Sequence, residues 1–134
     1  MFVQWGDYMH GHKHHEQLIK GVYTQFKPIM DHSPQAMYIY LDDEHLIWNK
    51  KFGELVGYKT VAEAHKKTND FLGLFVDKKN WKAVVTAFRN AMDKGVATNA
   101  VVGWKHRSGK VVKKQVILVP ICYDGHMMAL HFIG

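Results

Sequence analysis

The chain has 134 residues, of which 47% are hydrophobic and 22% charged, and a formal charge of +6. This length suits one domain with a core of its own and is too short for two. No apolar run approaches the roughly 20 residues of a membrane-spanning helix, and the N-terminus lacks the charged-then-apolar pattern of a signal peptide. The single cysteine, Cys122, cannot form an internal disulfide. We therefore expect a cytoplasmic protein without a membrane partner.

The positive charge is spread along the chain, with lysine pairs at positions 50–51, 66–67, 78–79 and 113–114. Pairs distributed in this way indicate solvated faces. A nucleic-acid-binding stripe would be concentrated on one element and interleaved with exposed aromatic side chains. The distribution therefore does not favour nucleic acid as a partner.

Histidines are concentrated near the N-terminus, in the run HGHKHHEQ at residues 10–17. His10 and His14 would share a face if a helix began this early, and imidazole is the commonest neutral metal ligand. Gly11 disfavours so early a start. We interpret the run as the polar beginning of a helix or part of a tag, with a metal site at His10 and His14 as the alternative.

An amphipathic helix is predicted from His15 to Met30, because apolar residues recur there at intervals of three and four. Pro28 would kink or end it. Its apolar face, which includes Leu18, Val22 and Phe26, needs a surface to cover. We expect that surface to be the outer face of a sheet or a second copy of the chain.

A hairpin follows the proline at position 34. Residues 36–41 and 46–48 are rich in β-favouring side chains, and the polar turn Asp42-Asp43-Glu44-His45 separates them. Asn49 is a good N-cap for a short helix that Gly57 can end in a left-handed conformation.

Two further helical segments are predicted before the C-terminal third. Thr60 and Glu63 match a capping box. Asp77 precedes the longest predicted helix, whose apolar stripe must lie against the sheet, and Lys94 and Gly95 provide its C-terminal charge and cap.

The remainder is predicted to form three strands, at residues 96–106, 111–122 and 126–133. The Asp124-Gly125 pair between apolar runs is a strong hairpin signal. In the last strand both alternating sets of side chains are largely apolar. Both faces of the sheet are therefore expected to be covered.

The order of these elements, and several motifs, resemble the PAS domain family. IMDHSPQAMYIY is similar to the family's opening segment, and IWNKKFGELVGYK resembles its strand-Asn-helix-Gly-Tyr signature. The C-terminal part, from WKHRSGKVV to HMMALHFIG, is similar to its closing three-strand meander, with glycines at the turns. The resemblance covers residues 27–134 and leaves residues 1–26 as an N-terminal arm and amphipathic helix.

The resemblance implies an α+β fold with a five-stranded antiparallel sheet of order 2-1-5-4-3 and helices on its inner face. Members of the family are usually sensory or dimerising modules without shared catalytic residues. Some enclose haem, flavin or another small molecule. Non-covalent haem or flavin is thus an open possibility, as is no cofactor. The photosensory flavin subgroup needs a cysteine in the region corresponding to residues 68–72, which has none here, so covalent flavin chemistry is excluded.

Two sets of site residues follow from the periodicity. The residues expected to face inward, around a ligand or as a plain packed core, are Ile39, Ile47, Phe52, Leu55, Leu72, Phe75, Trp81, Val85, Phe88, Trp104, Leu118 and Leu130. The residues expected at the outer face, under the N-terminal helix or at a dimer interface, are Leu18, Val22, Phe26, Tyr38, Tyr40 and His131.

Haem would require an axial ligand facing the interior. His65 is the candidate, although the lysines at 66–67 indicate a solvated surface there. The acidic residues 42–44 are interpreted as solvated turn residues, and no nucleophile–base pairing or phosphate loop is visible. We therefore expect no enzyme activity.

The leading hypothesis is a cytoplasmic PAS-type sensory domain that homodimerises, can bind a small molecule in its core, and passes a signal to an output domain or regulatory partner. One alternative is a ligand-free scaffold for protein–protein interaction. A third hypothesis is a haem-binding or metal-binding sensor.

Overall fold

The computed structural model describes residues 12–134, with side chains described from His14 onward. The predicted site residue His10 lies outside this range. The helices are α2 (His12–His32), α3 (Lys50–Val56), α4 (Val61–His65), α5 (Phe71–Phe75), a 3-10 turn (Lys78–Asn80) and α6 (Trp81–Lys94). The strands are β1 (Ala36–Tyr40), β2 (Leu46–Trp48), β3 (Thr98–Lys105), β4 (Val111–Tyr123) and β5 (His126–Ile133).

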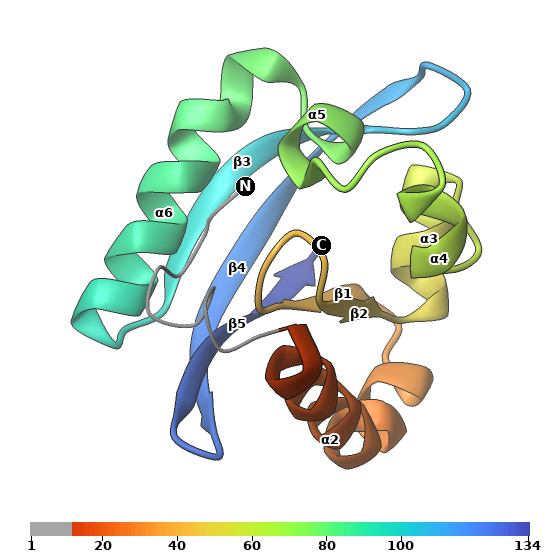
Figure 1. Cartoon of the computed structure of the whole chain (residues 1–134). Helices are drawn as coiled ribbons and strands as arrows, with labels where there is room; N and C mark the ends of the chain where they lie inside the picture. The colour runs from red at the N-terminus through yellow and green to blue at the C-terminus, as the bar shows by residue number, and fades with distance from the viewer. Residues whose placement is uncertain (1–11) are drawn as a thin grey trace.

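The strands form one antiparallel sheet with the order β2-β1-β5-β4-β3, which confirms the predicted α+β fold. The first hairpin and the C-terminal meander meet where β1 pairs with β5. β2 and β3 are the edge strands. Figure 1 shows α2 below β1, β2 and β5, with α3, α4, α5 and α6 around the opposite side of the curved sheet.

The predicted capping residues act as their chemistry requires. Thr60 accepts a hydrogen bond from the Glu63 amide at 3.1 Å. Gly57 ends α3 with φ of 81°, a conformation that costs glycine little. Asn49 caps α3 by accepting from the Phe52 amide at 3.0 Å. These contacts fix where the short helices begin and end.

Asn49 also bonds to two elements outside its own helix and to the connection between them. Its Oδ1 accepts from the Met37 amide in β1 at 3.0 Å, and its Nδ2 donates to the Met30 carbonyl of α2 at 3.0 Å and to the Gln35 carbonyl at 2.9 Å. Asn49 itself is buried. One side chain therefore joins the end of α2, the start of β1 and the start of α3.

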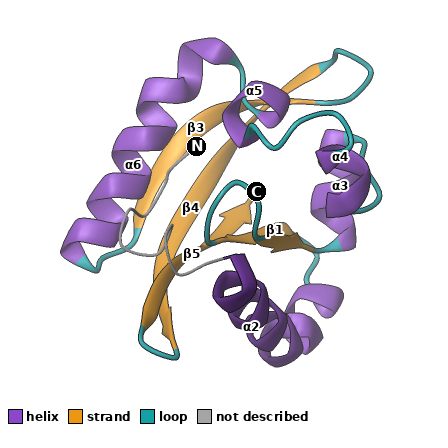
Figure 2. Cartoon of the chain, viewed as in Figure 1, coloured by secondary structure: helices purple, strands orange, loops and turns teal. Residues whose placement is uncertain are grey.

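The sheet separates two apolar clusters, and Figure 2 shows the helices on its two sides. The inner cluster lies between the sheet and α3–α6, and it includes Phe52, Phe75, Phe88, Trp104 and Leu118. The outer cluster lies between the sheet and α2. Its buried members are Leu18, Ile19, Val22, Met30, Met37, Ile39, Leu41, Met128 and Leu130.

The sequence-based assignment of faces is wrong for β1, β2 and β5. Ile39 and Leu130 belong to the outer cluster and Ile47 packs against it. Tyr38 and Tyr40 belong to the inner cluster. His131 pairs in register with Tyr38 and stacks on its ring, so it faces inward too. Both sets of side chains are large and mostly apolar, so alternation separated them without identifying the side that each set faces.

α2 covers the outer face of the sheet of the same chain, which is one of the two surfaces that we expected its apolar face to cover. Leu18 and Val22 are buried in the outer cluster, and Phe26 packs against it. The helix continues through Pro28 to His32, further than predicted. Met30, in the last turns of this helix, is buried in the outer cluster, and this packing offsets the hydrogen bond that proline removes. The boundary expected at residue 27 falls inside this helix.

The contribution of this cover to stability can be measured on two residues of α2. Leu18 is 3% exposed and Ile29 is 58% exposed. We expect Leu18→Ala to lower the free energy of unfolding by about 2–4 kcal/mol, because it leaves a cavity between helix and sheet. Ile29→Ala, the matched control, should change it by less than about 0.5 kcal/mol. Urea denaturation of both variants tests this, and equal effects would mean that α2 does not pack as described.

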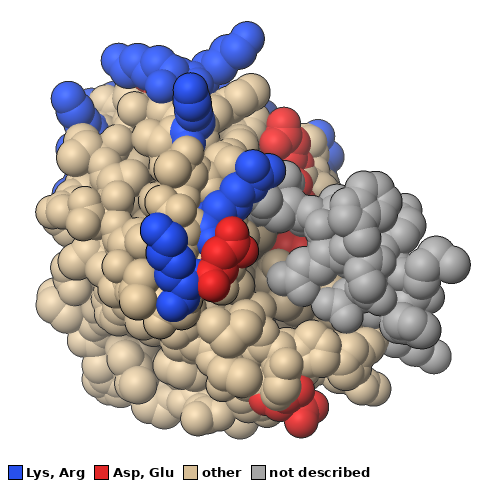
Figure 3. Space-filling view, turned by 90° about the vertical axis from the view of Figure 1, so that its left-hand side faces the viewer, with Lys and Arg blue, Asp and Glu red and all other residues tan. Residues whose placement is uncertain are grey.

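No helix among the described residues is long and apolar enough to cross a membrane. Figure 3 shows lysine and arginine side chains along the upper edge of one face and singly elsewhere, above a broad uncharged area. The basic side chains of that face do not form a continuous stripe.

Candidate functional site

The interior site is built around Tyr38, which β1 directs into the inner cluster. The His131 ring of β5 stacks on it with a centroid distance of 3.9 Å and an angle of 12°. Phe52 of α3 lies at 4.8 Å, Phe71 of α5 at 5.1 Å and Trp104 of β3 at 6.0 Å. Residues from four other elements thus surround the ring of Tyr38.

Two polar atoms of this site have no hydrogen-bond partner among the described residues: Nε2 of His131 and Nε1 of Trp104, both buried. The Nδ1–H of His131 donates to the Ala129 carbonyl at 3.1 Å, so Nε2 carries the lone pair of the neutral ring. The indole Nε1–H of Trp104 is a donor. The interior therefore offers one acceptor and one donor that a polar guest or a water molecule could satisfy.

Burial controls the charge of these groups. It lowers the pKa of His131 to about 3, against smaller opposing effects of hydrogen bonds with the backbone of Ala129 and Tyr38. Burial also raises the pKa of Tyr38 well above its ordinary value, and the nearby Tyr40 adds to this. At neutral pH the stacked pair is uncharged.

Most residues predicted to line a ligand pocket do face the interior. The inner cluster contains Phe52, Phe75, Phe88, Trp104 and Leu118, and the partly buried residues packed against it include Leu55, Leu72 and Trp81. On α6 it is Val84, and not the predicted Val85, that is buried in this cluster. Ile39, Ile47 and Leu130 lie on the other side of the sheet.

The space in which a haem or flavin would lie is filled by aromatic rings. Phe52 contacts Trp104 and Phe75 at centroid distances of 5.8 Å each, and Phe71 contacts Phe75 at 5.0 Å. Rings packed at these distances leave no room for a planar cofactor between them. The residues present do not fit haem or flavin in this conformation. Cys122 is exposed and lies on β4.

The strands connect the interior site to α2. Tyr38 pairs with His131 on the inner face, and the next pair, Ile39 with Leu130, lies under α2. Leu118 of β4 pairs with His131 from the other side. Displacement of the Tyr38–His131 pair therefore acts on backbone that also carries the outer cluster.

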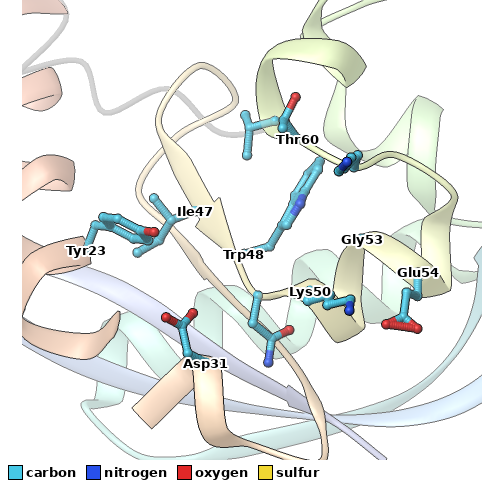
Figure 4. A pocket seen from close by; sticks show the side chains of 11 residues that line it. Tyr23, Asp31, Ile47, Trp48, Lys50, Gly53, Glu54 and Thr60 are labelled. Atoms are coloured by element: carbon cyan, nitrogen blue, oxygen red, sulfur yellow. The ribbon is translucent and has the colours of Figure 1, made fainter. Parts of the chain in front are cut away.

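A hollow of about 660 Å³ lies outside the core at the edge strand β2. Figure 4 shows Tyr23 and Ile47 on one side of this strand and Trp48 on the other, near Lys50, Gly53 and Glu54 of α3. The hollow is bounded by the helix that covers the outer face and by the first inner helix. It is a surface depression, not the predicted interior pocket.

A group of histidines surrounds Asp42 beside the start of α2. The Nδ1 atoms of His15 and His45 lie 2.6 and 2.7 Å from the two Asp42 carboxylate oxygens. Nearby, Nε2 of His14 lies 3.3 Å from Nε2 of His126. The N-terminal helix, the β1–β2 turn and the start of β5 meet here.

Asp42 is held as a carboxylate in this group. Burial raises its pKa, but hydrogen bonds from His45 and His15 outweigh this effect and leave the pKa lowered.

His65, the predicted axial ligand, is at the end of α4 and half-buried. Burial lowers the pKa of the His65 imidazole.

Sequence reasoning found His14 but missed the rest of the group. Asp42 was interpreted as a solvated turn residue, although its turn contains His45 three positions later. Contacts of that turn with His15 are between residues 27 apart in the sequence, which local patterns do not report. His126 is further still, 112 residues from His14.

No protein-family model and no curated protein matches this sequence. The structure is similar to a PAS domain from Colwellia psychrerythraea, with a TM-score of 0.66 and 16% identity over 84% of this chain and 95% of that one. It is also similar to a PAS domain from a two-component sensor histidine kinase, with a TM-score of 0.61 and 8% identity over 86% of this chain and 97% of that one.

An RNA-binding light-oxygen-voltage receptor is similar as well, with a TM-score of 0.60 and 16% identity over 88% of this chain and 33% of that one. Structural similarity at such low sequence identity shows a shared fold, and function must be argued from the site. The sheet order, the helices on the inner face and these similarities together lead to one conclusion: the chain has the fold of PAS domains.

Proposed function

We propose that the chain is a cytoplasmic sensory and signalling domain whose interior site controls the packing of α2 on the outer face of the sheet. The observation that supports this most directly is the pair of buried polar atoms, Nε2 of His131 and Nε1 of Trp104, for which the described part of the chain supplies no hydrogen-bond partner. Buried polar groups in folded proteins are usually satisfied. A small molecule with a donor and an acceptor would satisfy both.

The mechanism follows from the alternation along β1 and β5. A guest that contacts His131 and Trp104 would displace the Tyr38 ring and the strands that carry it. The same strands carry Met37, Ile39 and Leu130 under α2. A guest that binds one packing of α2 better than another would shift the population between the two.

A guest can be detected on the purified protein. Native mass spectrometry and an absorption spectrum should reveal a bound small molecule, and His131→Phe should reduce its occupancy because it removes the Nε2 acceptor. Asn80→Ala, which removes a hydrogen bond to the Gly103 amide but no side chain of the interior site, is the control. A protein of apo mass that binds nothing from a library of small polar compounds would contradict ligand sensing.

The domain is proposed to act as a homodimer. α2 leaves Tyr23 and Ile29 exposed, and the outer face of β3 and β4 leaves Val101 and Ile117 exposed. Exposed apolar side chains of this kind support an interface. Sedimentation of the wild type and of Ile29→Lys and Ile117→Lys variants tests the proposal. A monomer at all concentrations would contradict it.

The second candidate is a ligand-free scaffold for an output domain or regulatory partner. The direct ring contacts of Phe52, Phe71, Phe75 and Trp104 favour it, because they complete the core without a guest. A clean apo mass together with a dimer in sedimentation would support this candidate over the first.

A further inference from the structure

The outer edge of β3 is open along the first half of the strand. Further along, the Gly103 amide donates to Oδ1 of Asn80 at 2.9 Å, and the Gly103 carbonyl accepts from the Asp77 amide at 2.9 Å. These bonds point away from β4, so the backbone groups of every second residue of β3, Val101 and Asn99 included, face the same edge. Within residues 12–134, no backbone hydrogen bond from another segment reaches Val101 or Asn99. Their amides and carbonyls are therefore available to an added strand.

Two residues of the chain already begin such a strand. Val76 forms an antiparallel bridge with Trp104, and the next residue, Asp77, bonds to Gly103. The chain then turns away into the 3-10 turn that precedes α6. An extended segment that continued in the same direction would lie opposite the open part of β3.

The sequence of β3 does not protect this edge. Natural sheets often protect an unused edge with charged residues or proline on the edge strand. The stretch from Thr98 to Trp104 has neither, and Val101 is 51% exposed. The open edge is therefore suited to pairing with another segment.

A hollow of about 560 Å³ lies beside the open edge, between β3 and α6. Figure 1 shows the helix alongside the strand. The lining of the hollow includes the small side chains of Ala83, Ala87 and Ala100. Side chains of an added strand would alternate between the two faces of the sheet, so every second one would enter this hollow.

The charges of the hollow indicate the chemistry of the partner. Lys79 and Lys82 line it, and none of the described carboxylates does. Lys79 also contacts Asp77 at 3.7 Å, whereas Lys82 is exposed and forms no ion pair with a described residue. Acidic side chains in the hollow would complement these lysines. A second copy of the chain, with a charge of +6, would bring its own lysines to the same place and be repelled.

We propose that an extended acidic segment of a partner protein adds to β3 as an antiparallel strand. Its residues opposite Val101 and Asn99 would exchange backbone hydrogen bonds with β3 and place β-branched side chains on the outer face. The acidic residues between them would face Lys82. The site uses the edge of the sheet, not the interior site or the outer face proposed for the dimer, so neither of those proposals depends on it.

The probe is a short fluorescent peptide of alternating glutamate and valine, titrated into the full chain. We expect saturable binding that weakens as salt is raised, and no binding of a peptide of alternating lysine and valine. At saturation, amide hydrogen exchange at Asn99 and Val101 should slow by at least about fivefold. Exchange at Ala100, whose backbone faces β4, and at Gly103, which already has an acceptor, should not change.

Two variants separate charge from backbone pairing. Lys82→Glu should weaken binding of the acidic peptide by about threefold to tenfold. Lys51→Glu, the same charge change at an exposed position of α3, is the matched control and should change it by less than about twofold. Val101→Pro removes an amide that faces the edge and no bond to β4, so it should weaken binding by about threefold to tenfold.

A second peptide tests the same backbone bonds without any change to the protein. The acidic peptide with its valines N-methylated lacks the amides that would bond to β3, and it should not bind. This result holds even where Val101→Pro fails to fold, which the thermal transition of the variant reveals.

Three results would overturn the proposal: no binding of the acidic peptide at about millimolar concentration, equal binding of the lysine peptide, or binding that leaves exchange at Asn99 and Val101 unchanged. Exchange at these two amides that slows with protein concentration, without peptide, would identify a second copy as the occupant and would overturn it too. None of these results depends on whether a guest occupies the interior, which mass spectrometry measures separately.

Discussion

Replacing Asn49 with alanine is expected to lower the free energy of unfolding by about 3–5 kcal/mol, more than any other single change to a polar residue of the domain for which we give a value. The side chain makes four hydrogen bonds of 2.9–3.0 Å from a buried position. The substitution leaves the buried amides of Met37 and Phe52 without their Asn49 acceptor, each at a cost of about 1–3 kcal/mol before relaxation. The Met30 and Gln35 carbonyls lose the Asn49 donor and keep only longer contacts, from the Ser33 amide at 3.4 Å and the Ser33 hydroxyl at 3.2 Å. Urea denaturation measures the loss.

Two variants make this prediction specific. Asn80→Ala removes one side-chain hydrogen bond, from the Gly103 amide, and should cost about 1 kcal/mol. Asn49→Asp keeps the acceptor for the Phe52 and Met37 amides but loses both donors, so it should lie between the two alanine variants. An Asn49→Ala variant that loses no more than Asn80→Ala would show that the joint between α2, β1 and α3 is not stabilising.

The second large effect is a loss of stability on acidification through His131. Its pKa is about 3 in the folded protein against 6.5 ordinarily. Between these values the unfolded chain binds the additional proton, so this contribution is fully present above about pH 6.5 and is lost progressively as the pH falls toward 3. The slope is about 1.4 kcal/mol per pH unit, which gives about 2 kcal/mol between pH 7 and pH 5.

The comparison with His131→Phe isolates this group. Phenylalanine can still stack on Tyr38 but cannot take up a proton, so the variant should lose about 2 kcal/mol less than the wild type between pH 7 and pH 5. The difference between the two proteins cancels the contributions of the other histidines. Asp42, whose pKa is lowered, titrates below this interval. Equal pH dependence in both proteins would contradict the buried neutral state of His131.

Local chemistry predicted the boundaries of the short elements well. Asn49, Gly57 and Thr60 act as expected, because a cap depends on residues within one turn of it. The order of the strands also agreed, but through resemblance to a family. Nothing in the spacing of residues alone determined which strands would pair.

The face of each central strand could not be predicted in the same way. Ile39, Ile47 and Leu130 were correctly kept together, since Ile39 pairs with both of the others. Leu118, however, pairs with His131 and not with Leu130, so Leu118 and Leu130 cannot share a face. Register between strands is a long-range property, and two apolar faces give alternation no preferred direction.

The same periodicity assigned Tyr38, Tyr40 and His131 to the outer face, under the N-terminal helix or at a dimer interface. In the structure these residues fill the aromatic interior. Tyr40 satisfies its hydroxyl by donating to the Asp43 carboxylate at 2.7 Å, a contact within the hairpin that the sequence places only three residues away.

The central claim is that the Tyr38–His131 pair and α2 are coupled through β1 and β5. Amide hydrogen exchange along α2, compared between the wild type, His131→Ala and the inner-cluster control Val84→Ala, tests it most directly. After correction for global stability, we expect His131→Ala to lower protection across residues 18–30 and Val84→Ala to leave it unchanged. Equal protection of α2 in all three proteins would contradict the coupling.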